Sequence, residues 1–387
     1  MAEAYIVQAV RTAGGRRNGR LSSIHAVDLG AIALDALVQR SGIDPGAIDD
    51  VIMGCVSQAG EQSAQIGRHC VLASSLPQSV PAVTIDRQCG SSQQSIHFAA
   101  QAIMSGTQDI VIAAGVESMS RVPMGSAVAS PPDSSPYSPA LLDRYGVRGF
   151  SQFHGAEAIA RKYGHSREQL DAFALSSHRR AIAATDSGAF AAEIIPVDVV
   201  RPDGTPAVHD TDEGIRRDST PETMAGVKLL REDGVITAAT ASQITDGSSG
   251  VLIMSERALK DHGLTPLARI HTLTVTAGDP VVMLEEPLFA TDKALRRAGL
   301  TIADIDLYEV NEAFAPIPLA WLSHVGADPD RLNVNGGAIA LGHPLGASGT
   351  KLMTTLIHAL HARGGRFGLQ TMCEGGGVAN VTIVERL

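Results

Sequence analysis

The sequence predicts an α/β fold built from a duplicated unit: two pseudo-symmetric halves with an inserted loop region between them. Helical patterns alternate with short apolar strands, which is typical of a mostly parallel sheet covered by helices. The same order of elements occurs twice along the chain, over roughly a hundred residues each time. A long stretch of different character separates the two occurrences.

The first copy begins with a helical pattern over residues 28–40. Gly42 lies where this helix should end, because glycine accepts the left-handed conformation of a helix C-terminus. A strand is expected over 51–53. Further on, the turn Cys89-Gly90-Ser91-Ser92 leads into a helix that ends near residue 105, and a strand follows over 109–114.

The second copy repeats this order. A helical pattern over 291–297 is followed by Gly299 and by a strand over 307–310. In each copy an aspartate stands seven residues after the capping glycine, at the start of the strand. The glycine-rich turn from His343 to Gly349 then leads into a helix that ends near residue 363, with a strand over 366–372.

The stretch between the copies is predicted to be an inserted loop region with a small structure of its own. It contains Pro131-Pro132 and one expected helix, from Glu157 through Arg167 to Ala184. Insertions of this length often carry a lid or a binding surface. The predicted domains are residues 1–120 with 248–268, the inserted region 121–247, and residues 269–387.

Composition excludes several classes of protein. The formal net charge of −10 over 387 residues argues against nucleic acid as a partner. The four cysteines form no C-x-x-C pair, so neither a zinc site nor a disulfide framework is expected. No signal peptide, membrane span or peroxisomal C-terminal tripeptide is recognisable. A soluble protein of the reducing cytoplasm, without a metal, is the simplest interpretation.

Three residues stand where chemistry is expected. The repeat places Cys89 and His343 at equivalent points, each near a helix N-terminus, where the helix dipole lowers a cysteine pKa and a histidine can accept the proton. Cys373 follows an apolar strand and precedes three glycines, which let backbone N–H groups approach a ligand. The alternative is that both cysteines are structural and that the glycines only form a tight turn.

Several motifs together resemble the thiolase family. They are Cys89-Gly90-Ser91-Ser92, Asn311-Glu312-Ala313-Phe314, the stretch from Asn335 to Pro344, and Cys373-Glu374-Gly375-Gly376-Gly377. The glycine-rich histidine motif is the most specific of these, and the resemblance covers essentially the whole chain. It implies the duplicated αβαβα layered fold of thiolases and their activity, the CoA-dependent thiolysis of a 3-ketoacyl-CoA or the reverse Claisen condensation.

The resemblance also implies roles for particular residues. Cys89 looks like the nucleophile that carries the acyl group, and Cys373 like the general acid and base. His343 would accept the proton of Cys89 and share an oxyanion hole with a water held by Asn311. The backbone N–H groups of Cys89 and Gly375 would form a second oxyanion hole. Arg216 and Ser242 match residues that contact CoA, the adenine nucleotide and the pantetheine respectively.

The same resemblance implies CoA and acyl-CoA as substrates, no permanently bound cofactor, and a homodimer or homotetramer. The chain departs from short-chain biosynthetic thiolases at Phe153-His154-Gly155, at Met283-Leu284 and at Asp86-Arg87-Gln88. These places are expected to border the acyl pocket. The departures favour longer or bulkier 3-ketoacyl-CoAs, steroid side chains included, over acetyl groups alone.

Two other functions compete with this interpretation. A decarboxylating condensing enzyme of the ketoacyl-synthase type shares the duplicated fold but needs no second cysteine, so Cys373 argues against it. A non-catalytic lipid carrier should have lost one of Cys89, His343 and Cys373, and all three are present. A dinucleotide enzyme is disfavoured, because no G-x-G-x-x-G follows an early strand.

Overall fold

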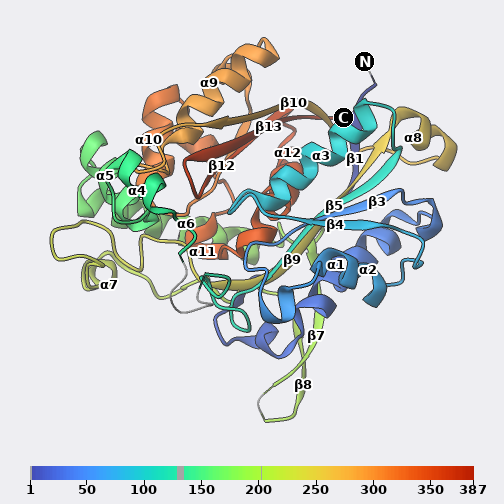
Figure 1. Ribbon diagram of the computed structural model, residues 1–387, viewed down its shortest axis with the longest axis horizontal. Coiled ribbons are helices and arrows are strands. Elements are labelled where there is room, and N and C mark those ends of the chain that lie inside the picture. The colour runs from blue at the N-terminus through green and yellow to red at the C-terminus, as the bar shows by residue number, and fades with distance from the viewer. Residues whose placement is uncertain (1, 129–134, 202) are drawn as a thin grey trace.

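The computed structural model describes residues 2–128, 135–201 and 203–387; residues 129–134 of the predicted inserted region, Pro131-Pro132 among them, and residue 202 lie outside this part (Figure 1). The helices are α1 Ala26–Ser41, α2 Ile66–Ala73, α3 Ser91–Met104, α4 Pro139–Tyr145, α5 Gln152–Tyr163, α6 Arg167–Asp186, α7 Pro221–Ala225, α8 Glu256–His262, α9 Glu286–Ala298, α10 Pro316–Val325, α11 Ala338–Leu341 and α12 Ser348–Arg363. The strands are β1 Ala4–Thr12, β2 Gly15–Arg16, β3 Asp50–Gly54, β4 Ala82–Ile85, β5 Ile110–Ser118, β6 Ile194–Ile195, β7 Val197–Val200, β8 Pro206–His209, β9 Thr245–Ser255, β10 Ala268–Ala277, β11 Leu307–Val310, β12 Phe367–Glu374 and β13 Val378–Arg386.

The order of the strands confirms the predicted duplication. The main sheet runs β11-β12-β13-β10-β1-β9-β5-β3-β4, with β1 and β10 antiparallel at its centre. Reading outward from this central pair gives β9, β5 and β3 on one side and β13, β12 and β11 on the other. The corresponding pairs have the same orientation on both sides, parallel for the outer pair and antiparallel for the inner ones.

The expectation of a mostly parallel sheet was wrong, because the sheet is mixed. Strands β9 and β13 each run antiparallel to both of their neighbours. In the second half the reason is local: β12 and β13 are joined across the three-residue turn Gly375–Gly377, and a turn this short can only connect antiparallel strands. Helix-and-strand alternation does not reveal the direction of such a return strand.

The layers follow from which helices share a core. Helices α3 and α12 pack together, and Ile96, Ile103, Met353 and Leu356 form one buried cluster with strand residues from both halves. Helices α1 and α2 cover the outer face of the first half, whereas α9 and α10 cover the second (Figure 1). The result is the αβαβα arrangement that the family resemblance implied.

The prediction that Gly42 and Gly299 end helices is confirmed in both halves. Gly42 and Gly299 have φ values of 69° and 68° at the C-termini of α1 and α9. The single helix expected over 157–184 was wrong, because Gly164 adopts φ 70° and ends α5. Ser166 and Gln169 then form a capping box that starts α6, so the same stretch contains two helices.

Candidate active site

The predicted catalytic residues stand at the ends of elements from both halves. Cys89 directly precedes Gly90, the N-cap of α3, and Asn311 follows the last residue of β11. Cys373 is the penultimate residue of β12. Because β11 and β12 are parallel neighbours, their carboxyl ends meet at the same edge of the sheet. His343 lies five residues before α12, with a short 3-10 turn between them, so its equivalence to Cys89 is approximate.

The hydrogen bonds of His343 determine which of its ring nitrogens is the base. The Ser348 hydroxyl contacts Nδ1 of His343 and also donates to the Pro344 carbonyl at 2.8 Å. A hydroxyl has one proton to donate, so this contact requires Nδ1 to carry the proton and Nε2 to carry the lone pair. The Asn311 amide nitrogen lies 3.4 Å from Nε2. Burial, and then the charge of Lys351, lower the pKa of His343 to about 3, so the imidazole is neutral.

The resting state of Cys89 differs from the prediction that a helix dipole would lower its pKa. Surrounding protein atoms desolvate the thiol, although the residue is partly exposed, and with the nearby charge of Glu374 they raise the pKa of Cys89 to about 12. Burial therefore outweighs the dipole of α3. Cys89 is a thiol at rest, and a base must take its proton when it attacks.

Cys373 is fully enclosed and close to Cys89. Its side chain is buried, and the desolvation together with the charge of a Cys89 thiolate raise its pKa well above the ordinary value for a thiol. The two sulfur groups thus influence one another although they are 284 positions apart in the sequence. Two thiols that are both protonated at rest can supply a nucleophile and a proton donor to a two-step acyl transfer.

Gly375 lies close to Gln88, the residue that precedes the proposed nucleophile Cys89. A Cβ atom at position 375 would be 2.9 Å from Oε1 of Gln88. The following glycines, Gly376 and Gly377, have φ values of 84° and 77° and form the turn between β12 and β13. Within the described part of the chain, the backbone N–H groups of Cys89 and Gly375 donate to no other residue's backbone carbonyl, and that of Cys89 contacts its own sulfur. Two such donors close to the thiol can bind an oxyanion.

A cleft of about 430 Å³ opens onto His343 from the inserted region. Arg216 and Ser242, the two residues expected to contact CoA, line this cleft together with His343. Much of the remaining wall is apolar, and the side chains that form it include Met119, Met124, Phe153, Leu230, Ile244, Phe314 and Leu345. The cleft is therefore suited to a long ligand that reaches the imidazole at its inner end.

The end of the inserted region is attached to the second half beside Asn311. The Ser242 backbone N–H donates to the Ala313 carbonyl at 2.9 Å, and Ala241 forms a bridge with Phe314. Phe153 from α5 packs edge-on against Phe314, with ring centroids 5.5 Å apart. Residues from three separate parts of the chain thus meet over the imidazole.

The three departures from short-chain thiolases lie in different places. Phe153 lines the cleft, and Gln88 lies beside Gly375. Met283 is buried in the core of the second half with φ 62°, and it is not among the residues that line the cleft. The carbonyl oxygen of its neighbour Val282 instead packs against Gly155 of α5.

Sequence reasoning missed several residues that hold the site together. Ser348 orients the imidazole, and Glu374 presses on Gly90. Glu312 accepts hydrogen bonds from Ser177, from Asn333 and from the Ile339 backbone, and so ties the inserted region to the histidine loop. Glu312 and Glu374 could both have been found as charged members of recognised motifs; Ser348 carried no such signal.

The described residues provide neither a metal-binding cluster nor a membrane-spanning helix. In the parts of the chain that the structure describes, no group of three or more His, Cys, Asp or Glu side chains is placed to hold a metal ion. None of the helices over those same residues combines the length and apolarity needed to cross a membrane.

Comparison with known proteins identifies relatives along the whole chain. Residues 4–257 match the family model described as thiolase, N-terminal domain, and residues 264–386 match the thiolase, C-terminal domain. The chain is 54% identical to the steroid 3-ketoacyl-CoA thiolase FadA6 of Mycobacterium tuberculosis, over 100% of this chain and 95% of the relative. It is 42% identical to a 3-ketoacyl-CoA thiolase of Cronobacter sakazakii over the full length of both. The crystal structure of human mitochondrial 3-ketoacyl-CoA thiolase superimposes with a TM-score of 0.89 at 37% identity, covering 100% and 99% of the two chains.

Proposed function

Because this chain belongs to the thiolase family and is an acyltransferase, we propose that it cleaves bulky 3-ketoacyl-CoAs with CoA through a thioester on Cys89. The proposal is supported by two pairs of residues: the Asn311 amide lies 3.4 Å from Nε2 of His343, and the charge of Cys89 acts on the Cys373 thiol. Asn311 and Cys373 lie at the carboxyl ends of the adjacent parallel strands β11 and β12, which supports a single site. The reverse Claisen condensation would use the same groups.

In the first half-reaction, Cys89 attacks the ketone carbon of the 3-ketoacyl-CoA. The unprotonated Nε2 of His343 takes the thiol proton as the sulfur–carbon bond forms. The carbon–carbon bond then breaks, the acyl group stays on Cys89, and Cys373 gives its proton to the departing α-carbon to release acetyl-CoA. The high pKa of Cys373 supports its role as this acid.

In the second half-reaction, CoA removes the acyl group. The Cys373 thiolate takes the proton of the CoA thiol, and the CoA sulfur attacks the thioester. Cys89 leaves as the new acyl-CoA is released and takes back its proton from Nε2 of His343, which restores the resting enzyme. Negative charge builds on the thioester oxygen, and the backbone N–H groups of Cys89 and Gly375 are the proposed donors to it. The Oδ1 atom of Asn311 is buried without a partner, which supports the proposal that Asn311 holds a water in the other oxyanion hole.

CoA would occupy the cleft of about 430 Å³, with its pantetheine at Ser242 and its nucleotide end at Arg216. CoA and acyl-CoA act as substrates, and no permanently bound cofactor is proposed. Two observations support a bulky acyl group. Phe153 and its apolar neighbours line much of the cleft with hydrophobic side chains. The relative at 54% identity is named for steroid 3-ketoacyl-CoA.

The proposed assembly is a homodimer or homotetramer. Strand β4 forms the free edge of the main sheet and leaves Val83 39% exposed, and Phe98 of α3 is 40% exposed. An apolar edge strand is a template for pairing with a second copy. Mass measurement by light scattering tests this, and a monomer at micromolar concentration would overturn it.

The proposed domains are residues 1–120 with 248–268, the inserted region 121–247, and residues 269–387. The strand order supports the two halves, since β1, β9, β5, β3 and β4 lie on one side of the β1–β10 pairing and β10, β13, β12 and β11 on the other, within one continuous sheet. The proposed compartment is the cytoplasm, which the four unpaired cysteines support. Fractionation of cells that produce the protein would test the compartment.

Thiolysis rates across a size series test the proposed function. Acetoacetyl-CoA, a long straight-chain 3-ketoacyl-CoA and a steroid 3-keto side-chain CoA are compared at saturating CoA. We expect kcat/KM to rise with acyl size, by about tenfold or more for each well-buried apolar increment. Phe153→Ala should change this ranking, whereas Phe289→Ala, an exposed phenylalanine on α9, should leave it unchanged. A preference for acetoacetyl-CoA would contradict the bulky-acyl proposal, and no thiolysis of any substrate would contradict the function itself.

A further inference from the structure

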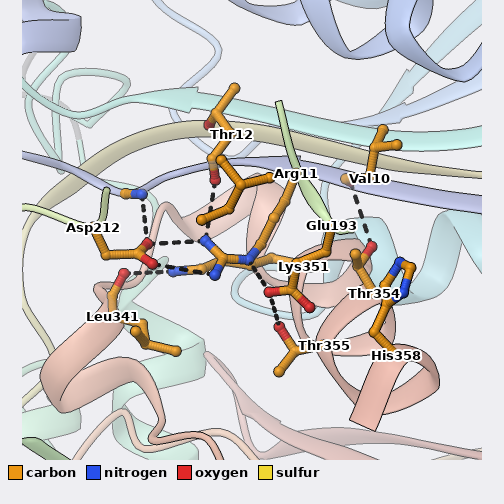
Figure 2. Close-up of polar contacts among 12 residues, drawn as sticks. Val10, Arg11, Thr12, Glu193, Asp212, Leu341, Lys351, Thr354, Thr355 and His358 are labelled. Carbon is orange, nitrogen blue, oxygen red and sulfur yellow. Dashed lines mark hydrogen bonds and ion pairs between the residues drawn. The ribbon is translucent and has the colours of Figure 1, made fainter. Parts of the chain in front are cut away.

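Four charged side chains are buried together behind His343, and the proposed mechanism does not use them. Arg11 of β1, Glu193, Asp212 and Lys351 of α12 are each 5% exposed or less (Figure 2). Two are cations and two are anions, so the cluster is formally neutral. Because buried charges are costly to desolvate, a cluster of this size calls for a reason.

Lys351 connects the cluster to the catalytic histidine. Its ammonium group donates to the Leu341 carbonyl at 2.5 Å (Figure 2). It also donates to the Gly342 carbonyl at 2.9 Å. These are the last two carbonyls before His343. Helix α11 ends at Leu341, and Gly342 turns the chain sharply away with φ 80° and ψ 165°. A buried helix end leaves carbonyl groups without helical donors, and Lys351 satisfies them.

Helix α12 therefore holds the histidine loop on both sides of the imidazole. Ser348, its first residue, contacts Nδ1 of His343, and Lys351, one turn later, holds the two peptides that precede it. On the backbone of His343 itself, the N–H donates to the Gln243 carbonyl at 3.2 Å and lies 3.1 Å from the Thr245 hydroxyl. The direction of the ring is thus set by contacts at three consecutive residues.

The other three charges are joined to one another by hydrogen bonds and act on Lys351 through their charge. Asp212 accepts from Arg11 at 2.9 and 3.1 Å and from the Gly14 backbone N–H at 2.7 Å. Arg11 also donates to Glu193 at 2.6 Å, and Glu193 accepts from Thr355 of α12 at 3.0 Å. A Cβ atom at Gly14 would lie 2.5 Å from the Leu341 carbonyl oxygen, so the end of β1 packs on the same carbonyl that Lys351 binds.

From this geometry we propose that Lys351 is a positioning residue for His343, which it orients through the Leu341 and Gly342 carbonyls. The inference rests on the proposed role of His343 as the base. Lys351 lies outside the cleft and touches no substrate, so its effect belongs to the chemical step and not to binding. Its charge also acts on the imidazole, because it is the second cause, after burial, of the low pKa of His343.

The charged groups that face Lys351 decide its own protonation. Burial lowers the pKa of Lys351 to about 8, and Asp212 and Glu193 oppose this, whereas Arg11 adds to it. Glu309 of β11 also faces Lys351, and burial together with its neighbour Glu312 raises the pKa of Glu309 well above the ordinary value. Lys351 is consequently charged at neutral pH and begins to lose its proton in mildly alkaline solution.

Lys351→Met tests the proposal because it keeps the apolar length and removes the ammonium group. We expect kcat for thiolysis to fall roughly 10- to 100-fold, the size of effect that a misplacement of about 1 Å produces. The KM values for CoA and for the ketoacyl-CoA should stay within about threefold of those of the parent enzyme, because the substitution removes no contact with either substrate. Lys351→Arg, which keeps a cation and its donors, should recover part of kcat. Lys260→Met, at an exposed lysine of α8, is the matched control.

A second variant separates positioning from folding. Lys351→Met leaves Asp212 with one cation fewer, so the protein could simply be less stable. The double variant Lys351→Met with Asp212→Asn removes one charge of each sign and should recover thermal stability without recovering kcat. If kcat returns together with stability, Lys351 is only structural and the proposal is overturned.

The pH profile supplies a readout that stability cannot produce. Without the Lys351 charge the pKa of His343 rises, so the acid limb of the kcat/KM profile should move to higher pH in Lys351→Met. An unmoved limb with unchanged kcat would overturn the proposal. His343→Asn is measured in parallel. If this variant retains thiolysis, the proposed function is wrong. If His343→Asn is inactive while Lys351→Met has normal activity, only the positioning role of Lys351 is wrong.

Discussion

The side chain of Glu374 occupies the space that any side chain at position 90 would need: a Cβ atom on Gly90 would lie 1.9 Å from Oε1 of Glu374. The two residues come from opposite halves of the fold. Each directly follows one of the two proposed reactive cysteines, Cys89 and Cys373. The contact therefore sets how close the turn that carries the nucleophile lies to the strand that carries the acid and base.

Gly90→Ala should damage the site more than the fold. The added methyl must displace the Glu374 carboxyl, and such overpacking costs about 1–3 kcal/mol of stability. We expect the rate of Cys89 acylation to fall by about a hundredfold because the thiol is moved. Single-turnover acylation and urea unfolding measure the two effects. Gly149→Ala is the control, since a methyl there meets nothing within 4 Å; equal acylation rates for both variants would contradict the argument.

Glu374→Gln should change how stability depends on pH. Burial, partly offset by Arg87, raises the pKa of Glu374 to about 8 from the ordinary value of 4.5 for a glutamate. The folded protein then holds a proton that the unfolded chain releases, so this group's contribution to stability falls as pH rises between about 4.5 and 8. The glutamine variant lacks this loss and should gain melting temperature relative to the parent between pH 6 and pH 8. Glu232→Gln, at an exposed glutamate, should show no such trend.

Cys89→Ala should abolish the acyl-enzyme. No other proposed group can carry the acyl chain, so incubation with radiolabelled acetyl-CoA should leave the variant unlabelled and thiolysis at background. Cys70→Ala, which removes a buried thiol of α2, is the matched control and should label normally. Stoichiometric labelling of Cys89→Ala would end the assignment of the nucleophile.

Cys373→Ala should separate the two half-reactions. Cys89 and His343 remain, so the variant should still accept an acetyl group from acetyl-CoA, yet turnover should drop by at least about a hundredfold, the low end of the contribution of a positioned acid–base group. Mass spectrometry of the acyl-enzyme and steady-state thiolysis give the two values. Normal turnover would show that another group handles the proton of CoA.

Asn311→Ala should slow carbon–carbon bond chemistry and leave the nucleophile in place. The amide nitrogen lies 3.4 Å from Nε2 of His343, and loss of one oxyanion contact costs about 3 kcal/mol, or on the order of a hundredfold in kcat. Stopped-flow thiolysis measures this, while alkylation of Cys89 by iodoacetamide should stay near the parent rate. A parallel fall in alkylation would indicate that Asn311 supports the whole site instead.

Local signals in the sequence located most of the elements. The strand 307–310 was expected with the bounds that β11 has, and glycines at 42 and 299 ended helices because few other residues adopt a positive φ at low cost. The break at Gly164 could have been predicted from the same glycine signal, together with the capping box that Ser166 and Gln169 form after it. It was missed because apolar spacing on both sides suggested one continuous helix.

The sequence by itself determined the duplicated order of elements, the glycine caps and the motif residues, because each of these depends on the conformational preferences of short segments. Only the tertiary structure decided the antiparallel placement of β9, the thiol state of Cys89 and the contact of Lys351 with the histidine loop. Strand direction, desolvation and the pairing of charges such as Lys351 and Asp212 arise between residues that are distant in sequence. The local sequence around each residue therefore does not predict these features.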